Sequence, residues 1–564
     1  MLGSDIIAEA FIRHGLKRIF TFPGGTIAPT FDAIRRKNIE ILCAHHEQGA
    51  GYAALAVARL TRRPQVVMVT SGPGVTNLAT VVADAYFDST PLVALTGQVG
   101  TADLTSGRQV RQCGFQQVDA MALMKPISKA TFLPLSPSDL PGMIEEAFYV
   151  AAEGRPGPVV MDLPMDVQLA DVDVSPDVKP RMGVPPNEPE HSLINKAAEL
   201  ISIAAKPVIF AGQGVLLSNA CRELRLLAES RGIPVVMSLL GLGAFPTNSA
   251  LALGFPGHTG NQYANRAIHE ADLLLVIGAR LDVRQTGTCT DQFVPNGKII
   301  RVDLDLSELK YSRVRSDLDI HADAQCALTQ LRQALEGKSE PDLSSWLAQI
   351  EKCKAEYPLA YDTGNELLKP QQVIQTVNRM TAGKRVVVIT GVGSHQQWSA
   401  RHFDFDFPDR AWLTSGGHGA MGYDLPTAIG AQLERPKDLV ICFVGDGSLQ
   451  INIQELQTAV INKTPVKIFV LDNRRLGLVS QFQLFNWDSD PTTGNKKSPD
   501  FTAIARAYGM QAYTIAKAED LEPIISKTLA FDGPVLVHCL VDQKENVSPM
   551  LLPKKTMDRM WPYA

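Results

Sequence analysis

The sequence predicts an α/β protein made of three doubly wound domains, each built on a parallel β-sheet. Strand-length runs that are apolar on both faces alternate with helix-like stretches along most of the chain, which is the pattern of parallel sheets covered by helices. A stretch rich in proline and charge at 173–190 and a looser one between 336 and 368 interrupt this alternation. With 564 residues the chain is also too long for one core, since domains average about 150 residues.

The first predicted domain covers residues 1–173 and the second covers residues 190–340. In the first, helices are expected at 48–58 and 137–152, between strands at 41–44, 65–70, 91–96 and 158–162. In the second, strands are expected at 207–211, 234–237, 273–277 and 298–302. The stretch 173–190 is expected to be a linker, because its prolines can continue neither a helix nor a strand.

The third predicted domain covers residues 365–545, with strands expected at 386–389, 439–444, 466–471 and 535–539. Residues 546–564 have the polar, proline-containing composition of a C-terminal tail. No short-period repeat is visible, so any relation between the first and third domains has to be a structural one.

The composition is that of an ordinary globular protein, with 45% hydrophobic and 20% charged residues. A net charge of −5 gives no basic field that would attract nucleic acid or an anionic membrane. The longest apolar runs are far shorter than the roughly 20 residues of a membrane helix, and no signal peptide is visible. The eight cysteines are scattered without a CxxC pair, which favours a reducing compartment, so we expect a cytoplasmic protein.

The most specific motif lies in the third domain. The strand expected at 439–444 runs into Gly445-Asp446-Gly447-Ser448, and the next strand ends at Asp472-Asn473. The carboxylate of Asp446 and the side-chain amide of Asn473 can converge on one hard cation, to which they offer the oxygen ligands that Mg²⁺ favours. The glycines let backbone N–H groups approach a phosphate closely, although Gly-Asp-Gly alone is also common in turns.

In the first domain, the strand at 41–44 leads into His45-His46-Glu47. A glutamate in an apolar cleft has a raised pKa and can hold a proton against a cofactor ring. The simpler explanation of Glu47 is a carboxylate that complements the dipole at the start of a helix. The two histidines do not indicate a metal site, because adjacent side chains of a strand point to opposite faces.

The order of the motifs resembles the acetolactate-synthase-like family of thiamine diphosphate enzymes. The motifs in that order are PGG at 23–25, HEQGAGY at 46–52, SGPGVTN at 71–77, TGQV at 96–99, GVGSHQQW at 391–398 and TSGGHGAMGYDLP at 414–426, followed by the stretch from GDGSLQ to VLDN. The resemblance covers about residues 5–549 and implies thiamine diphosphate-binding folds in the first and third domains around a nucleotide-binding-type middle domain. It implies an enzyme that decarboxylates a 2-keto acid and transfers the two-carbon acyl anion to a carbonyl acceptor.

The resemblance also implies residue roles. Glu47 is the expected activator of thiamine diphosphate, and Met421 is expected to force the bent form of this cofactor. Mg²⁺ is expected on Asp446, Asn473 and a main-chain carbonyl near Arg475. The other expected contacts to thiamine diphosphate are Pro23, Gly24, Gly25, Thr70, Asn77, Gln98, His395, Gln396, Gly419, Gly445, Gly447 and Ser448. In this family the glutamate and the metal site belong to different subunits, so we expect a homodimer or homotetramer with the active site at the subunit interface.

The middle domain carries a weaker nucleotide signal. Gly-rich strand ends and later carboxylates suit a phosphate cradle and a ribose acceptor, but there is no GxGxxG, and a domain without a ligand fits as well. GARLDVRQTG at 278–287 resembles the GARFDDRVTG of flavin-containing acetolactate synthases, which implies bound FAD with a structural role. The expected contacts are Gly212, Gly214, Arg280, Asp282, Arg284, Asp303 and Asp323. FPGHTG at 255–260 departs from the usual MLGMHG and places His258 and Thr259 on the flavin side.

Pyruvate is the donor that the resemblance implies. By that resemblance Phe115, Gln116 and Lys129 line its channel, although a solvated lysine is the usual alternative for Lys129.

The acceptor side departs from the biosynthetic enzymes, because DNRRLGLVSQFQ at 472–483 stands where the family usually has NNEEQGMVTQWQ. Leu478 replaces a methionine, and Phe482 replaces a tryptophan, which can admit a bulkier acceptor. The Arg474-Arg475 pair either binds a phosphate or carboxylate or is a solvated surface charge.

Three functions stay open on the sequence alone. The first is an acetolactate synthase that joins two pyruvates, or pyruvate and 2-ketobutyrate. The second is a related carboligase that transfers the two-carbon unit to a larger ketone or aldehyde, such as a nucleotide-linked keto sugar. The third is a non-catalytic paralogue that serves as a structural or regulatory subunit, which the intact Glu47, Asp446 and Asn473 disfavour.

Overall fold

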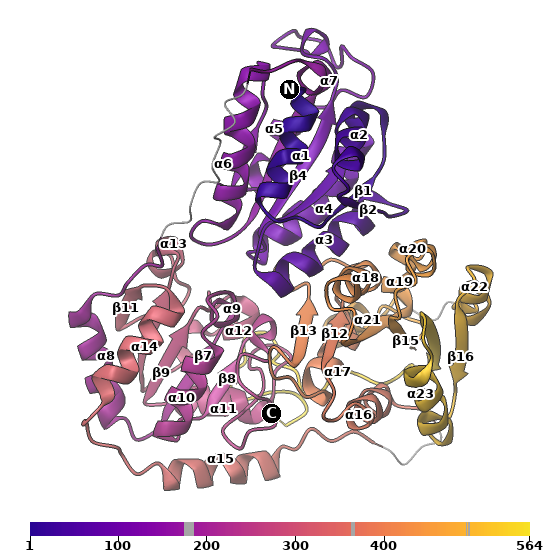
Figure 1. Ribbon diagram of the computed structural model, residues 1–564. Coiled ribbons are helices and arrows are strands. Elements are labelled where there is room, and N and C mark those ends of the chain that lie inside the picture. The colour runs from indigo at the N-terminus through magenta and orange to yellow at the C-terminus, as the bar shows by residue number, and fades with distance from the viewer. Residues whose placement is uncertain (174–184, 363–366, 492, 494–496, 564) are drawn as a thin grey trace.

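The computed structural model describes residues 1–173, 185–362, 367–491, 493 and 497–563. They form three α/β domains, each with one parallel sheet, so the predicted fold class is confirmed. Figure 1 shows the N-terminal domain above the middle domain and the C-terminal domain, which lie side by side below it. Most of the predicted linker at 173–190 lies outside the described residues, and the predicted domain boundaries stay predictions.

The N-terminal domain has a six-stranded sheet in the order β2-β1-β3-β4-β6-β5, with every pair parallel. Its strands are β1 (Arg18–Phe22), β2 (Glu40–Cys43), β3 (Gln65–Val69), β4 (Leu92–Gln98), β5 (Ala130–Phe132) and β6 (Pro158–Pro164). Its helices are α1 (Gly3–Arg13), α2 (Ala28–Arg36), α3 (Glu47–Thr61), α4 (Pro73–Phe87), α5 (Ala120–Met124), α6 (Leu140–Ala152) and α7 (Met165–Leu169). The central strands β3 and β4 are buried along their whole length, as expected for a sheet with helices on both faces.

The middle domain has a five-stranded parallel sheet in the order β11-β10-β9-β7-β8. Its strands are β7 (Pro207–Ala211), β8 (Val235–Met237), β9 (Leu273–Ile277), β10 (Lys298–Asp303) and β11 (Leu318–His321). Its helices are α8 (His191–Ile203), α9 (Gln213–Leu217), α10 (Cys221–Arg231), α11 (Gln262–Glu270), α12 (Val283–Thr286), α13 (Leu306–Lys310), α14 (Ala324–Leu335) and α15 (Ser344–Glu356).

The C-terminal domain has a six-stranded parallel sheet in the order β13-β12-β14-β15-β17-β16. Its strands are β12 (Val386–Thr390), β13 (Arg410–Thr414), β14 (Leu439–Gly445), β15 (Lys467–Asp472), β16 (Gln511–Ile515) and β17 (Val535–Leu540). Its helices are α16 (Pro370–Met380), α17 (Ser394–His402), α18 (Asp424–Glu434), α19 (Asp446–Ile451), α20 (Glu455–Ile461), α21 (Gly477–Trp487), α22 (Phe501–Ala507) and α23 (Leu521–Ala530). Strand for strand, this order is the same as that of the N-terminal sheet, so the two outer domains share one topology.

The N-terminal and C-terminal domains are joined by the packing of α3 against α18. At Gly430 a Cβ atom would lie 2.1 Å from the carbonyl oxygen of Ala53, so only glycine lets the two helices approach this closely. The rings of Tyr52 and Tyr423 meet edge to face beside this contact, with centroids 5.1 Å apart. A single hydrophobic core cluster continues across the contact from one domain into the other.

Residues 546–563 fold back over the middle domain (Figure 1). Leu551, Met557 and Met560 are buried in the core of that domain, and the Leu551 N–H donates to the carbonyl oxygen of His258 at 2.7 Å. The predicted tail is therefore a packed segment, because a few apolar side chains within its polar sequence find a place on the middle domain.

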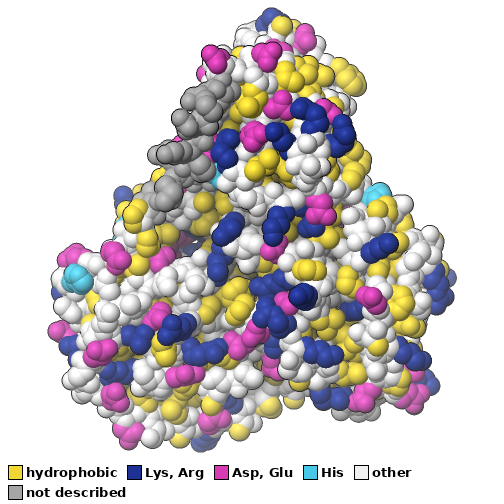
Figure 2. All heavy atoms as spheres, viewed as in Figure 1, with side chains coloured by type: hydrophobic (Ala, Val, Ile, Leu, Met, Phe, Trp, Pro, Cys, Tyr) yellow, Lys and Arg dark blue, Asp and Glu magenta, His cyan; other side chains and the backbone are white. Residues whose placement is uncertain are grey.

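In Figure 2, acidic and basic side chains are interspersed over the face in view, and the N-terminal lobe stands above the other two. Among the helices in the described ranges, none has the length and apolar character needed to cross a membrane.

Candidate functional site

A cavity of about 860 Å³ lies where the three domains meet. Arg155 and Phe87 of the N-terminal domain belong to its wall, together with residues of both other domains. The predicted contacts that line it are Gly214, Arg280, Asp282, Arg284, Asp303 and Asp323 from the FAD set, and Gln396, Gly419 and Leu478 from the thiamine diphosphate and substrate sets. A cavity of this size accommodates a ligand larger than an amino acid.

Glycines bring two strand ends together beneath this cavity. A Cβ atom at Gly214 would lie 2.7 Å from the Cα of Gly278, and one at Gly212 would lie 1.9 Å from the carbonyl oxygen of Gly278. The backbone after β7 therefore lies directly against the backbone after β9, and the Gly214 N–H donates to the carbonyl oxygen of Gly278 at 3.0 Å.

The carboxylates of the FAD set already have partners within the chain. Asp282 caps α12 and accepts a 2.6 Å bond from Arg280 Nη2. Asp323 caps α14 and accepts a 2.9 Å bond from the hydroxyl of Ser218. Burial raises the pKa of Asp303, whose Oδ1 accepts the N–H of Asp305. These groups hold the cavity wall in place and still present charge to its interior.

His258 is one of the residues that line the cavity, and its Nδ1 is buried and makes no hydrogen bond in the described part of the chain. Burial, with the charges of Arg284 and Arg401, lowers the pKa of His258 to about 4, so the ring is neutral near pH 7. A neutral imidazole with a free nitrogen suits a bound polar group, and the cavity thus fits a polar ligand such as a flavin nucleotide.

The three predicted metal ligands lie together at the carboxyl ends of β14 and β15. One terminal atom of the Asn473 amide lies 3.2 Å from Asp446 Oδ1 and 2.7 Å from the carbonyl oxygen of Arg475. With nitrogen at that place the amide donates to both, whereas with oxygen there three oxygens converge as in a Mg²⁺ site. Burial and the charge of Asp472 raise the pKa of Asp446 to about 7, so a cation that offsets this carboxylate is favoured. The donor set therefore fits a divalent metal.

One carboxylate ties together the elements that carry the predicted diphosphate contacts. Asp424, the first residue of α18, is 1% exposed and accepts hydrogen bonds from the Gly391 N–H and the Ser448 hydroxyl. His395 Nε2 lies 3.0 Å from Asp424 Oδ1, so this nitrogen carries a proton. Gly445, whose Cβ position would be 3.0 Å from His395 Nδ1, completes this edge of the sheet. Asp424 could not be recognised from the sequence, because only the fold brings these three loops to it.

The loop 414–423 brings the predicted pyrimidine contacts to the same edge. Gly419 has a φ of 75°, and its N–H donates to Ser415 Oγ at 3.1 Å. The side chain of Met421 reaches the Gly-Asp-Gly turn, where a Cβ atom on Gly447 would lie 3.3 Å from Met421 Cε. Gln396 donates to the carbonyl oxygen of Ser415 at 2.9 Å. The metal, diphosphate and pyrimidine sets of the C-terminal domain are thus adjacent.

Glu47 and its neighbours lie elsewhere, in the N-terminal domain. Glu47 begins α3, is 4% exposed and accepts a 2.9 Å bond from Asn77 Nδ2. Gln98 ends β4 and donates to Asp162 Oδ2 at 2.8 Å. The other members of this set follow the ends of β1 and β3 and are Pro23, Gly24, Gly25 and Thr70. None of them is among the described residues that line the cavity at the three-domain junction.

The predicted substrate residues are spread over three places. Phe115 is 83% exposed on the N-terminal domain, and Gln116 beside it has a φ of 62° and lies against Gly72. Phe482 is 50% exposed on α21. Lys129 donates to the carbonyl oxygen of Glu153 at 2.5 Å, and the structure brings it to none of the other predicted residues.

The guanidinium group of Arg475 is hydrogen-bonded within its own chain. It donates to the carbonyl oxygen of Gln543 at 3.0 Å, to the carboxylate of Asp490 at 3.0 Å and to the hydroxyl of Ser480. Arg474 is exposed. Arg475 is therefore not a solvated surface charge, and the carboxylate that it binds belongs to its own chain, whereas Arg474 is exposed as a surface charge would be.

Comparisons with known proteins match these three domains one by one. The families matched are the thiamine pyrophosphate enzyme N-terminal TPP binding domain over residues 1–123, the central domain over residues 194–331 and the C-terminal TPP binding domain over residues 391–539. Acetolactate synthase 2, chloroplastic, of Nicotiana tabacum is 38% identical over 97% of this chain and 83% of its own length. The acetolactate synthase large subunit of Cyanidium caldarium is 37% identical over 99% of this chain and 96% of its own, and the isozyme 3 large subunit of Escherichia coli (strain K12) is 37% identical over 99% and 98%.

We predict that Asp424→Asn weakens the binding of Mg²⁺-thiamine diphosphate by about tenfold or more, because the amide nitrogen replaces one of the two oxygens that accept and so faces a group that also donates. The dissociation constant is measured by fluorescence titration. The matched control is Asp409→Asn, whose carboxylate makes an exposed ion pair with Arg385 in the same domain, and it should bind like the native protein. Equal dissociation constants for Asp424→Asn and the native protein would contradict the role of Asp424.

Proposed function

The chain belongs to the acetolactate synthase large-subunit family of thiamine pyrophosphate enzymes, and we propose that it decarboxylates pyruvate and joins the two-carbon unit to a second carbonyl compound. With pyruvate as that acceptor, the product is acetolactate. The observation that carries the proposal is the convergence of Asp446, Asn473 and the Arg475 carbonyl beside the Gly-Asp-Gly turn. This oxygen donor set suits Mg²⁺ that also binds a diphosphate.

The C-terminal domain binds the diphosphate end of the cofactor. Asp446, Asn473 and the Arg475 carbonyl would hold Mg²⁺, and the segments that carry His395 and Ser448, both held by Asp424, would approach the diphosphate. When bound, thiamine diphosphate supplies a carbon nucleophile that accepts the electrons of the broken C–C bond. Met421, which reaches the Gly-Asp-Gly turn, would support the bent form of the cofactor.

Glu47 has the second role, which is to hold a proton against the pyrimidine ring of the cofactor. Its burial and its hydrogen bond from Asn77 support this role, because they hold the carboxyl in one orientation away from water. Within one chain Glu47 is separate from the cavity that Gln396 and Gly419 line. We therefore place Glu47 at the site of a second copy, in a homodimer or a homotetramer.

Exposed apolar side chains support such an assembly. They occur on the N-terminal domain near residue 115 and on α21 of the C-terminal domain, and they include Val110, Phe115, Val479, Phe482 and Trp487. Covering these side chains with a second copy removes apolar area from water and brings the two halves of each site together.

FAD is the ligand that we propose for the cavity between the domains, with a structural role. The glycine crossing of Gly214 and Gly278 and the free Nδ1 of His258 support it. Its chemistry is not needed for the net reaction, since decarboxylation and C–C bond formation transfer no electrons to an external acceptor. The expected location of the enzyme is the cytoplasm, for which its eight free cysteines are the support.

The products formed from pyruvate test the proposed reaction. Incubated with pyruvate, Mg²⁺ and thiamine diphosphate, the protein should form acetolactate and release one CO₂ for each acetolactate, measured by chromatography and CO₂ detection. Product formation only after a larger ketone or aldehyde is added would assign the enzyme to the second class of carboligase. No CO₂ release from any 2-keto acid would leave the non-catalytic paralogue.

Mixing two inactive variants tests whether the active site is shared between two subunits. Glu47→Gln and Asp446→Ala should each be inactive, but their co-expression should restore about a quarter of native activity, because half of the dimers are mixed and each mixed dimer has one intact site. Retained binding of Mg²⁺-thiamine diphosphate by Glu47→Gln serves as the folding control. If mixing restored nothing, Glu47 and Asp446 would have to act within one chain.

The flavin content of the purified protein tests the FAD assignment. The purified protein should be yellow and should release FAD on denaturation, identified by absorbance and chromatography. Gly214→Val should lower the FAD content by about tenfold, since its side chain would collide with the backbone of Gly278. Gly142→Ala in α6 is the matched control, because an added Cβ there meets nothing within 4 Å. A colourless preparation without flavin would refute the FAD assignment.

A further inference from the structure

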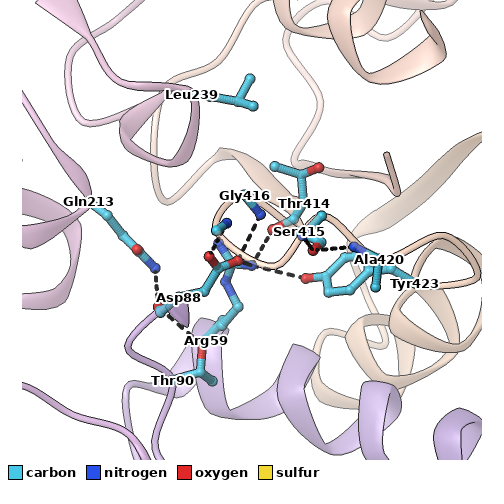
Figure 3. Close-up of polar contacts among 12 residues, drawn as sticks. Arg59, Asp88, Thr90, Gln213, Leu239, Thr414, Ser415, Gly416, Ala420 and Tyr423 are labelled. Carbon is cyan, nitrogen blue, oxygen red and sulfur yellow. Dashed lines mark hydrogen bonds and ion pairs between the residues drawn. The ribbon is translucent and has the colours of Figure 1, made fainter. Parts of the chain in front are cut away.

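One carboxylate of the N-terminal domain holds the loop that follows β13. Asp88, directly after α4, is 1% exposed. Its Oδ2 accepts the N–H of Gly416 at 2.9 Å, and its Oδ1 accepts the N–H of Gly417 at 2.6 Å. Figure 3 shows Asp88 pointing into this loop. A carboxylate that accepts two successive backbone N–H groups fixes both the position and the orientation of the segment.

Arg59 holds the two ends of the same loop. From the last turn of α3 it donates to the carbonyl oxygen of Thr414, where the loop begins, and to the hydroxyl of Tyr423, where the loop ends, at 3.1 Å. Its Nη1 lies 3.7 Å from Asp88 Oδ2, so the two side chains act as one buried pair (Figure 3). The loop 414–423 is therefore fixed at its start, its middle and its end by the N-terminal domain of the same chain.

The middle domain supports the same point. Gln213 Nε2 donates to the main-chain carbonyl of Asp88 at 3.0 Å, and the Leu239 carbonyl accepts a 3.0 Å bond from Trp412 in β13. Figure 3 shows Gln213 and Leu239 approaching from the side opposite Tyr423. All three domains thus meet at Asp88 and at the strand that leads into the loop.

The buried charges at this junction balance. Arg59 and Asp88 are 6% and 1% exposed, so an unpaired charge here would be costly. Burial, with the charge of Asp88, raises the pKa of the nearby Asp84 well above its usual range.

We propose that Asp88, with Arg59, is a positioning residue that sets the loop 414–423 in the conformation that binds the aminopyrimidine ring. The loop carries Gly419 and Met421, the expected ring contacts, and its side-chain-free residues Gly416 and Gly417 make their bonds to Asp88 through the backbone. This role rests on the proposed function. It means that each N-terminal domain serves two active sites, with Glu47 at the site of a second copy and Asp88 at the site of its own chain.

The test compares Asp88→Asn and Asp88→Glu with the native full-length protein. Asp88→Asn turns a donor toward one of the two N–H groups, and Asp88→Glu keeps the charge but displaces the carboxylate. Three quantities are measured: hydrogen–deuterium exchange of the peptide containing 414–423, the dissociation constant of Mg²⁺-thiamine diphosphate, and the near-ultraviolet circular dichroism of the bound cofactor. We expect faster exchange in the loop, about tenfold weaker binding and an altered dichroism band for both variants.

The matched control is Asp406→Asn, which removes a different interdomain carboxylate, paired with Arg225 at 2.6 Å between the middle and C-terminal domains. It should leave all three quantities unchanged. Faster loop exchange with native cofactor binding and dichroism would overturn the positioning role, and so would unchanged exchange. If Asp88→Asn does not fold, the same three measurements on Asp88→Glu are used instead, because this variant keeps the charge opposite Arg59. Failure of the native protein itself to bind the cofactor would instead refute the proposed function.

Discussion

The packing of α3 against α18 is the contact on which the rest of the site depends. Because Gly430 has no side chain, the backbones of the two helices touch, and the relative position of the outer domains follows from that contact. Helix α3 begins with Glu47 and carries Arg59 in its last turn, while α18 begins with Asp424. A shift of either helix would therefore move together the proposed activating carboxyl Glu47, the loop anchor Arg59 and the residue Asp424 that supports the expected diphosphate contacts. Such a junction transmits strain because packed interiors yield little.

The polar interior of this protein is organised around carboxylates that accept from the backbone rather than from arginine alone. Asp88 accepts from two glycine N–H groups, and Asp424 accepts from the N–H of Gly391. Glu455, fully buried in α20, accepts the His45 N–H that precedes Glu47. Each of these hydrogen bonds joins two segments that are distant in the sequence. The bonds offset the cost of removing the carboxyl group from water, and they fix a loop of the candidate site. The loops that carry the expected cofactor contacts are thus held by buried carboxyl groups that are not expected to touch the cofactor.

The sequence predicted the fold class and the central strands, because those strands are apolar on both faces. It did not predict five strands, and four of them, β5, β11, β13 and β16, lie at sheet edges, where polar residues are tolerated and the hydrophobic pattern fades. The Asp446 and Asn473 pair was predictable, since parallel strands end at one edge. Asp88 was not, because nothing local distinguishes a carboxylate at a helix end from one that reaches a glycine loop 328 residues away.

The segment that follows the last strand has a consequence for the order in which the molecule is completed. Leu551 binds the carbonyl oxygen of His258, and the methionines near the C-terminus fill the core of the middle domain. The middle domain, whose strands all precede the C-terminal domain in the chain, therefore receives part of its core from residues that are synthesised after that domain. Its core stays incomplete until residues 551–560 have been made, so we expect the middle domain to reach its final packing only after the strands of the C-terminal domain have left the ribosome.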